Sequence, residues 1–367
     1  MPDKPVVHLI AAARPNFMKI APLYHVFLRQ GWAKPVLVHT GQHYDANMSG
    51  DFLRDLGLPD PDISLGVGSG SHAQQTAGVM LAYEEVCQQA MPDFVVVVGD
   101  VNSTLAVTIT AKKLLLPVGH MEAGLRSRDR TMPEEINRIV TDALCDLLWT
   151  PSPDADENLR AEGVPEEKIV RVGNVMLDAY ELMREKISAD PITDLLGLTV
   201  GDYGVVTLHR PFNVDEEISL GQLVETIRAV SELLPLVFPV HPRTRSRLEA
   251  FGLWDTLDRA GDVLLMEPLS YIPFMSLVQN ARMVITDSGG IQEETTYLGI
   301  PCLTLRPNTE RPITITHGTN QLVTAETLLK AAGKHLALGK QEVQPIEFWD
   351  GHTADRVVEN LRVWMQG

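Results

Sequence analysis

Short runs of apolar residues alternate with longer amphipathic stretches along the whole chain. In the first half the apolar runs predict strands at 6–12, 35–40, 94–98, 117–121, 148–150 and 168–172, and the amphipathic stretches predict helices at 17–29 and 134–147. The second half predicts strands at 204–208, 236–240, 263–266, 283–286 and 301–305, and helices at 220–234 and 353–365. Strands with few internal polar residues are typical of parallel sheets covered by helices on both faces. The pattern therefore predicts an α/β protein.

The length of 367 residues is more than one hydrophobic core usually serves, so two domains are expected. The charged, irregular stretch 185–203 is predicted to link them. We expect a Rossmann-like domain over 1–180, completed by the C-terminal helix 353–367, and a second Rossmann-like domain over 181–352. Two doubly wound domains that face a cleft form the arrangement called GT-B.

Composition excludes several classes of function. The formal net charge of -17 argues against nucleic acid or an anionic membrane as the main partner. The three cysteines are far apart and form no CxxC pair, so neither a metal site nor a disulfide framework is expected. No signal-peptide pattern and no apolar run of 18 residues is present, so a cytoplasmic protein without membrane spans is expected.

Carboxylates follow two consecutive predicted strands. Asp100 comes after the run 94–98, and Glu122 comes after the run 117–121. The carboxyl ends of parallel strands meet at one sheet edge, where open α/β sheets bind ligands, so proton chemistry is indicated there. The alternatives are structural: Asp100 as a helix cap in competition with Asn102 or Ser103, and Glu122 as the ion-pair partner of Arg126.

Two further acids, Glu134 and Glu135, follow Pro133 at a predicted helix start. An acid at that position is also explained by the helix dipole alone. Near the N-terminus, Arg14 stands at a strand end and Lys19 about one helical turn later, which favours an anion site over ordinary surface charge. The segment GVGSGSH at 66–72 mimics a dinucleotide fingerprint, but it follows PDPDIS and not a buried strand, and no helix opens at the right place, so a loop is predicted.

The second half carries its own phosphate-binding signals. Ser288, Gly289 and Gly290 form a strand–turn–helix junction whose backbone N–H groups suit a phosphate, and Glu294 suits a ribose diol, although a Gly-rich turn without ligand has the same pattern. His209 and His241 both end apolar strands. Three cations lie nearby in the sequence, namely Arg210, Arg243 and Arg245. They favour binding of a phosphorylated ligand over a structural role for the two histidines.

At these residues the chain resembles the non-hydrolysing UDP-N-acetylglucosamine 2-epimerases. The resemblance covers nearly the whole length and is carried by ARPNFMKIAPL, TGQHYDANM, VVVVGDVNSTLA, GHMEAGLR, MPEEINR, VGNVMLDA, TLHRP, PVHPRTR, TDSGGIQEE and TERP. It implies the GT-B fold, a UDP-sugar substrate, no cofactor and a homodimer. Ala12-Ala13 in place of Gly-Thr, RPFNVD after His209 and the ending FWDGHTADRVV resemble a subgroup that includes epimerases of UDP-2,3-diacetamido-glucuronate.

The resemblance also assigns roles to residues. The implied catalytic residues are Asp100, Glu122, Glu134 and His209. The implied substrate-binding residues are Arg14, Lys19, Arg210, Phe274, Ser288, Gly289, Gly290, Glu294 and Arg311, although composition alone makes Phe274 a core residue. Positions that bind a second UDP-sugar as an activator in some bacterial members are matched by Gln42, His43 and His241.

Inversion at C2 of an N-acetylhexosamine needs a route, because the C2 proton is not next to a carbonyl carbon. Oxidation at C3 needs a nicotinamide, and the sequence offers no convincing site for one. Elimination of UDP to a glycal and re-addition needs acids for the proton and cations for the departing diphosphate. UDP-GlcNAc 2-epimerisation is therefore predicted. A GT-B glycosyltransferase, a hydrolysing relative and a nucleotide-sugar sensor are the alternatives.

Overall fold

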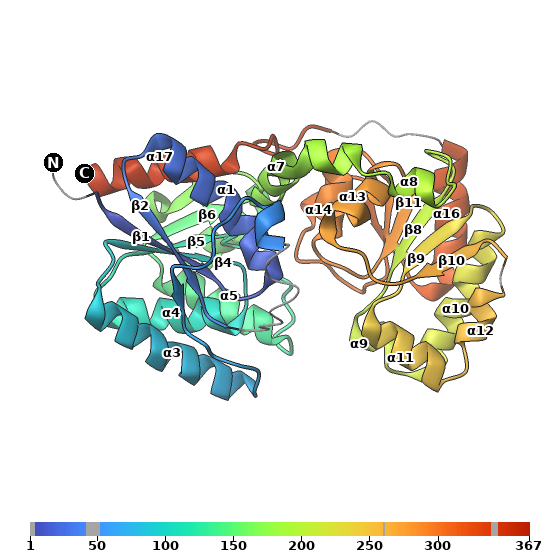
Figure 1. Cartoon of the computed structure of the whole chain (residues 1–367), viewed down its shortest axis with the longest axis horizontal. Helices are drawn as coiled ribbons and strands as arrows, with labels where there is room; N and C mark the ends of the chain where they lie inside the picture. Colours follow the sequence, from blue (N-terminus) through green and yellow to red (C-terminus); the bar gives the residue numbers. More distant parts are fainter. Residues whose placement is uncertain (1–3, 42–51, 260, 339–343) are drawn as a thin grey trace. The chain divides into compact units, whose positions relative to one another are not determined.

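The computed structural model describes residues 4–41, 52–259, 261–338 and 344–367. The chain folds into two units, Met1–Leu182 with Ile346–Gly367, and Met183–Pro345. Each unit is built on its own parallel sheet, and Figure 1 labels the elements of both. The helix α7 (Val175–Ala189) contains the residues at which the first unit ends and the second begins.

The sheet of the N-terminal unit has, in the described residues, the strand order β3-β2-β1-β4-β5-β6-β7, and all its pairings are parallel. Its strands are β1 (Val6–Ala11), β2 (Lys34–His39), β3 (Ile63–Ser64), β4 (Phe94–Val98), β5 (Val118–Met121), β6 (Leu147–Thr150) and β7 (Ile169–Arg171). All five residues of β4 are buried, which is what its uninterrupted apolar sequence predicted. The strand order reverses between β1 and β4, the point at which doubly wound sheets bind ligands.

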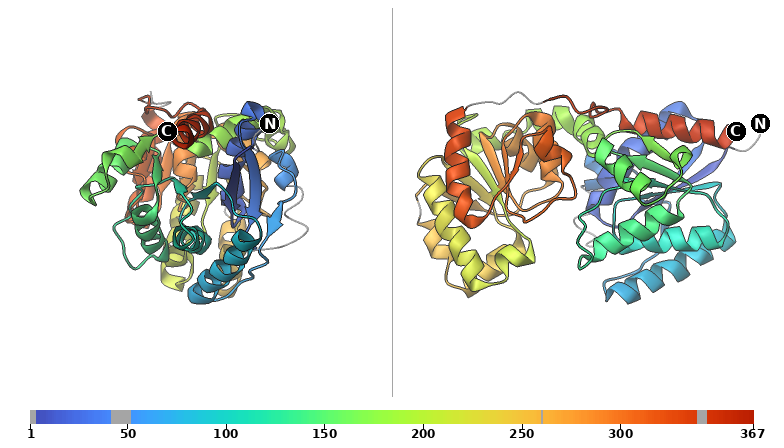
Figure 2. Two further views of the ribbon diagram at one scale, coloured as in Figure 1. Left: turned by 90° about the vertical axis from the view of Figure 1, so that its left-hand side faces the viewer. Right: turned by 180° about the vertical axis from the view of Figure 1, so that it is seen from behind.

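Helices cover both faces of this sheet. Figure 1 shows α3, α4 and α5 on one face and α1 and α17 on the other, and the view from behind in Figure 2 shows the same layers. The helices of this unit are α1 (Arg14–Gln30), α3 (His72–Gln89), α4 (Asn102–Lys113), α5 (Pro133–Leu144), α6 (Pro153–Ala161) and α17 (Thr353–Gln366), with a 3-10 turn at Glu166–Lys168. Because α17 packs against α1, the last helix completes the N-terminal unit.

The sheet of the C-terminal unit has, in the part described, the order β10-β9-β8-β11-β12-β13, again with parallel pairings. Its strands are β8 (Gly204–Thr207), β9 (Leu236–Pro239), β10 (Val263–Met266), β11 (Met283–Thr286), β12 (Cys302–Thr304) and β13 (Asn320–Leu322). Its helices are α8 (Ile192–Leu195), α9 (Pro211–Val214), α10 (Glu217–Ser231), α11 (Pro242–Ala250), α12 (Trp254–Asp258), α13 (Tyr271–Gln279), α14 (Ile291–Leu298), α15 (Ile313–Thr316) and α16 (Ala325–Leu338). Its strand order reverses between β8 and β11.

Three sequence-based expectations differ from the structure. The stretch 185–203 is not an irregular linker, because it contains the end of α7 and the whole of α8. The stretch 346–352 belongs to the N-terminal unit, where Trp349 Nε1 donates a 2.9 Å hydrogen bond to the carbonyl oxygen of Pro151. The GVGSGSH segment is a loop over most of its length, but it follows the short edge strand β3 and opens α3, whose first turn is capped by Ser71.

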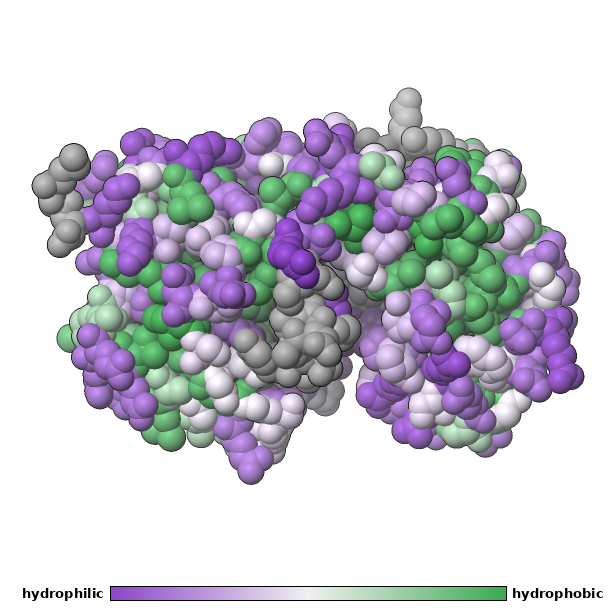
Figure 3. Space-filling view, viewed as in Figure 1, coloured by the Kyte–Doolittle hydropathy of each residue, from purple (hydrophilic) through white to green (hydrophobic). Residues whose placement is uncertain are grey.

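In the face shown in Figure 3, hydrophilic and hydrophobic residues are interspersed over each unit. No helix within the described ranges is long and apolar enough to cross a bilayer.

Candidate active site

The catalytic candidates of the N-terminal unit lie at the carboxyl ends of β1, β4 and β5. Gly99 follows β4 with a φ of 70°, and its N–H donates to the carbonyl of Met121 at the end of β5. A Cβ on Gly99 would lie 3.4 Å from Lys19 Nζ and 3.6 Å from Glu122 Oε2. The backbone after β4 therefore passes beside both groups, and the positive φ explains the glycine.

Lys19 and Glu122 form an ion pair at this edge. Lys19 Nζ donates to Glu122 Oε2, and the two side chains are 12% and 5% exposed. Glu122 has a φ of 67°, a left-handed conformation that is uncommon for a residue with a side chain and recurs at functional sites. The expected partnership with Arg126 is wrong, because the guanidinium of Arg126 pairs with Asp142 and Glu162 instead.

Asp100 is held by a buried arginine that sequence reasoning missed. Arg138 Nη1 donates to Asp100 Oδ2, while Arg138 Nη2 donates to Glu135 Oε2 at 2.8 Å. Asn137 Nδ2 donates to the carbonyl oxygen of Asp100 at 2.8 Å, which fixes the backbone as well. Capping does not explain Asp100, because α4 begins after Val101 and has no side-chain cap.

Glu135 and Glu134 have different surroundings although they are neighbours. Glu135 is 2% exposed and accepts bonds from the N–H groups of Ser127 and Arg128, so it fixes the loop before α5. Burial raises the pKa of Glu135, but these bonds and Arg138 outweigh burial and lower it. Glu134 is half-buried and has no ion-pair partner among the described residues. In the described part of the chain, Glu135 pairs with Arg138 and Glu134 pairs with no cation.

The two cations of the predicted anion site at α1 have different surroundings, and the anion site stays a prediction. Lys19 faces Glu122, whereas Arg14 is exposed and places its guanidinium 4.8 Å from the ring centroid of Phe52. Asn16 ties the turn to the sheet by accepting from Ala13 N at 3.0 Å and donating to the carbonyl of Val98 at 3.1 Å.

In the C-terminal unit, Asp287 organises the end of β8. This carboxylate is fully buried and accepts hydrogen bonds from the N–H groups of His209 and Arg210, from Asn213 Nδ2 and from His209 Nδ1 at 3.0 Å. Burial raises the pKa of Asp287, but the bonds from His209 and Asn213 outweigh it and lower the pKa. Asp287 therefore holds the Nδ1–H tautomer of His209 and leaves Nε2 available for a ligand.

The second histidine and the arginines around it are arranged differently from expectation. His241 lies 5.6 Å from His209 between ring centroids, and burial lowers its pKa with help from the His209 charge. Arg243 pairs with Asp215, and Arg245 pairs with Glu249 and Glu267. These two arginines are thus committed to surface ion pairs. By contrast, the buried Nε of Arg210 has no hydrogen-bond partner in the part of the chain described.

The turn Ser288–Gly290 leads from β11 into α14 at the same sheet edge. A Cβ on Gly289 would lie 2.8 Å from Glu310 Oε1 and 3.1 Å from Arg311 Nη1, so an ion-pair network lies directly against this glycine. A Cβ on Gly290 would meet nothing within 4 Å, so the space beside the first N–H groups of α14 is open. This space suits an anion.

Arg311 belongs to that network rather than to open solvent. It pairs through Nε with Glu293 at 2.8 Å and through Nη1 with Glu310, which also pairs with Arg306 at 2.9 Å. Burial raises the pKa of Glu310, but the two arginines outweigh it and lower the pKa strongly. Arg311 therefore supports the wall behind Gly289.

Glu294 and Phe274 lie on two helices that contact each other, α14 and α13. Glu294 is 5% exposed, and burial raises its pKa to about 7, although a 2.6 Å hydrogen bond from the Tyr271 hydroxyl lowers it. Phe274 lies one helical turn after Tyr271 on α13 and is half-buried, so the core role expected from composition is wrong. Gln42 and His43 lie outside the described residues.

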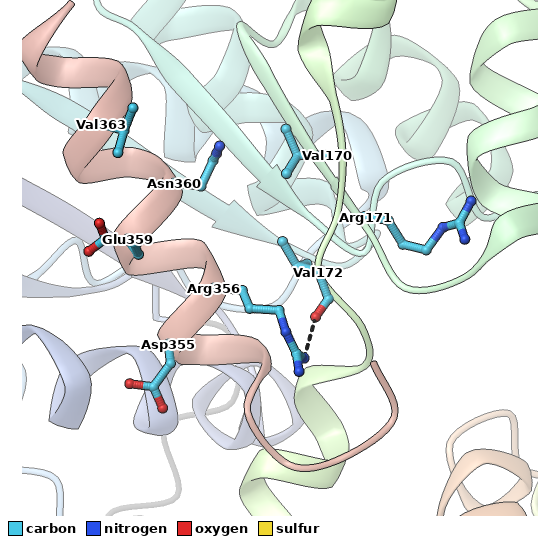
Figure 4. A pocket seen from close by; sticks show the side chains of 8 residues that line it. All are labelled: Val170, Arg171, Val172, Asp355, Arg356, Glu359, Asn360 and Val363. Atoms are coloured by element: carbon cyan, nitrogen blue, oxygen red, sulfur yellow. Dashed lines mark hydrogen bonds between the residues drawn. The ribbon is translucent and has the colours of Figure 1, made fainter. Parts of the chain in front are cut away.

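A separate pocket of about 530 Å³ lies in the N-terminal unit between β7 and α17 (Figure 4). The predicted site residues are absent from the lining shown in Figure 4, in which Arg356 Nη1 donates to the carbonyl of Val172 at 3.0 Å. The charged lining residues pair with neighbouring side chains: Arg171 with Asp156, Asp355 with Arg29, Arg356 with Asp350 and Glu359 with Arg362. The pocket therefore adds no residue to the candidate site.

Sequence reasoning missed Asp287, Arg138, Asn137 and Tyr271. Asp287 and Arg138 stand inside the motifs TDSGGIQEE and MPEEINR, so their positions beside predicted site residues were a usable signal. Tyr271 stands three residues before Phe274, but nothing in the sequence connects it to Glu294, which is 23 positions away.

Two parallel Rossmann-like sheets, each with polar side chains gathered at its switch point, define a protein of the GT-B class. The family model for UDP-N-acetylglucosamine 2-epimerase matches residues 27–362. The chain belongs to the UDP-N-acetylglucosamine 2-epimerase family, and the predicted family and fold class are confirmed.

Individual relatives cover nearly the full length. The chain is 40% identical to the UDP-N-acetylglucosamine 2-epimerase of Methanocaldococcus jannaschii over 96% of this chain and 98% of that protein. It is 38% identical to the UDP-2,3-diacetamido-2,3-dideoxy-D-glucuronate 2-epimerase of Pseudomonas aeruginosa over 96% and 98%. The crystal structure of the M. jannaschii enzyme with UDP-GlcNAc and UDP has a TM-score of 0.88, and the match covers 98% of this chain and 99% of that one.

Proposed function

We propose that this protein interconverts UDP-GlcNAc and UDP-ManNAc by eliminating UDP to a glycal and adding it back, without a cofactor. The observation that carries the proposal is the pairing of two strand-end acids with cations in the N-terminal unit. Lys19 holds Glu122, and Arg138 holds Asp100. A family member with two cation-paired carboxyl groups at this edge has the groups that proton transfer at C2 requires.

The elimination step breaks two bonds, C1–O and C2–H, and forms two, the second bond of C1=C2 and a carboxyl O–H bond. The C1–O bond breaks and its electron pair stays on the β-phosphate oxygen. The C2–H electron pair forms the C1=C2 double bond, and the proton goes to a carboxylate. Re-addition reverses these events with a proton delivered to the other face of C2. Two proton carriers are therefore needed, one for each face of the sugar.

The N-terminal unit supplies these carriers. Asp100 accepts a hydrogen bond from Arg138 and Glu122 accepts one from Lys19, and carboxylates placed in this way suit proton transfer. Glu134, which pairs with no cation in the described part, suits the exchange of a proton with the glycal. We assign the proton work to this group of three acids and not to a single member.

The C-terminal unit is proposed to hold the nucleotide. The N–H groups at Ser288–Gly290 and the Nε2 of His209, oriented by Asp287, suit the diphosphate. Stabilising the negative charge of departing UDP lowers the barrier to elimination. Glu294 suits the ribose hydroxyls, and the half-buried ring of Phe274 suits the base.

A substrate panel tests the proposal. UDP-GlcNAc and UDP-2,3-diacetamido-glucuronate are each incubated with the protein and followed by proton NMR of the anomeric region. We expect UDP-ManNAc to accumulate from UDP-GlcNAc. UDP-2,3-diacetamido-glucuronate is the second candidate substrate, because the chain is similar to the P. aeruginosa enzyme. Conversion of this sugar alone would show that it, and not UDP-GlcNAc, is the substrate.

Matched variants connect the reaction to the site. Asp100→Asn lowers kcat roughly 100-fold or more if Asp100 takes part in proton transfer. The control is Asp60→Asn, because Asp60 is an exposed acid of the same unit. Equal kcat values for Asp100→Asn and Asp60→Asn would indicate that Asp100 has only a structural role. Free UDP formed only with an added acceptor would indicate a glycosyltransferase, and free ManNAc would indicate a hydrolase.

A further inference from the structure

Tyr271 is the group that holds Glu294 in place. It is the first residue of α13, and its hydroxyl donates a 2.6 Å hydrogen bond to Glu294 Oε1 on α14. The two helices are in direct contact. Since Tyr271 contacts one carboxylate oxygen, it fixes the plane of the carboxylate and the direction of Oε2.

Within the described residues, the charged and titratable groups around Glu294 leave it without a cation of its own. Glu293, its neighbour on α14, raises the pKa of Glu294, but Glu293 is itself paired with Arg311. Arg306 and Arg311 both pair with Glu310. On β12, which contacts α14, burial raises the pKa of the Cys302 thiol to about 11, so this strand adds no charge through Cys302. Tyr271 is therefore the polar group that the structure shows bonded to the Glu294 carboxylate.

We propose that Tyr271 is a positioning residue that orients Glu294 toward the vicinal hydroxyls of a ribonucleotide, so that this pair selects ribose and makes nucleotide binding pH-dependent. A carboxylate whose plane is fixed accepts both hydroxyls of a diol at defined positions. The proposal rests on the proposed nucleotide-binding role of the C-terminal unit and names the residue that controls its ribose contact.

The direction of the pH dependence follows from the surroundings of Glu294. Burial, the largest effect, raises its pKa to about 7, and the hydrogen bond from Tyr271 lowers it. The ionised form, which accepts from both hydroxyls, therefore increases as the pH rises through about 7. Replacing Tyr271 by phenylalanine removes a bond that favours the ionised form, so the increase moves to higher pH.

Calorimetric titration of the full-length protein with UDP and with 2′,3′-dideoxy-UDP measures the ribose contact directly. The β-phosphate also titrates near pH 6, but both nucleotides share it, so the ratio of the two Kd values isolates the ribose. In the wild type we expect the preference for UDP to grow between pH 6 and 8.5. In Tyr271→Phe we expect the preference for UDP over dideoxy-UDP to fall roughly tenfold at pH 7.5. Loss of one hydrogen bond to a charged group changes a Kd by about this factor.

A matched variant controls for the loss of a buried tyrosine hydroxyl. Tyr203 is fully buried in the same unit and donates a bond of the same 2.6 Å length to the carbonyl of Leu277. Tyr203→Phe is expected to leave the ratio of the two Kd values unchanged. Glu294→Gln provides a second route, because it removes the charge and is expected to abolish the pH dependence of the ratio.

The outcomes separate this inference from the proposed function. A Tyr271→Phe protein with the wild-type ratio at every pH overturns the role of Tyr271, while UDP binding by the wild type leaves the proposed nucleotide site standing. Equal weakening of UDP and dideoxy-UDP in Tyr271→Phe also overturns it, because the effect is then structural. A wild type that binds neither nucleotide overturns both.

Discussion

Glu294→Gln is expected to stabilise the free protein in a pH-dependent way. Glutamine has nearly the same shape and keeps an oxygen for the Tyr271 hydroxyl, but it carries no charge to bury. In the wild type, burial raises the pKa of Glu294 from 4.5 to about 7. A change of that size corresponds to roughly 3 kcal/mol of folding free energy at pH values above 7.

The sign follows from the raised pKa. The folded protein favours the protonated acid, so the stability associated with Glu294 is present below pH 4.5 and is lost as the pH rises to about 7. Glutamine does not titrate, so the variant gains less than about 1 kcal/mol at pH 5 and roughly 3 kcal/mol at pH 8 relative to the wild type.

Urea unfolding at pH 5 and pH 8, followed by far-UV circular dichroism, measures this difference. Glu185→Gln is the control, because Glu185 is exposed in the same unit and its replacement is expected to change the midpoint equally at both pH values. A Glu294→Gln variant whose advantage is the same at pH 5 and pH 8 would refute the reasoning. UDP should reverse the order, because the ionised acid is proposed to bind the ribose.

Substitutions at Arg138 and at the Gly289–Gly290 turn probe the buried ion pairs of the two units. Arg138→Met leaves the Glu135 carboxylate, 2% exposed, without its cation, so urea unfolding should show a loss of about 3 kcal/mol and kcat should fall, with Arg138→Lys recovering part of both. Unchanged stability in Arg138→Met would contradict the proposed network. Gly289→Ala puts a methyl group 2.8 Å from Glu310 Oε1 and should cost about 1–3 kcal/mol, whereas Gly290→Ala, with nothing within 4 Å, should unfold like the wild type. Equal midpoints for the two alanine variants would show that the turn adapts freely.

The apolar pattern predicted the strands well because parallel strands buried on both faces have a simple signature. The strands β4 and β11 lie within one residue of their predicted ranges, and the acids after β4 and β5 meet at one edge as expected. The short edge strands β3 and β13, with two and three residues, were not predicted, because so few residues carry no periodicity.

The partners of the site residues could not be predicted from local sequence. Arg138 meets Asp100 across 38 positions, and Asp287 meets His209 across 78. Such contacts depend on which strand ends lie side by side, which is a property of the sheet order. The motifs identified the turns that carry the site residues. Only the fold shows that Asp287 contacts His209 after β8 and that Arg126 pairs with Asp142.

Epimerisation in D2O tests the central claim most directly. Elimination and re-addition exchange the C2 proton for one from carboxyl groups that exchange their protons with solvent, so UDP-ManNAc formed from UDP-GlcNAc should carry deuterium at C2. Proton and deuterium NMR of the isolated product measure it. Product that retains protium at C2 throughout the reaction would contradict proton transfer by Asp100, Glu122 and Glu134.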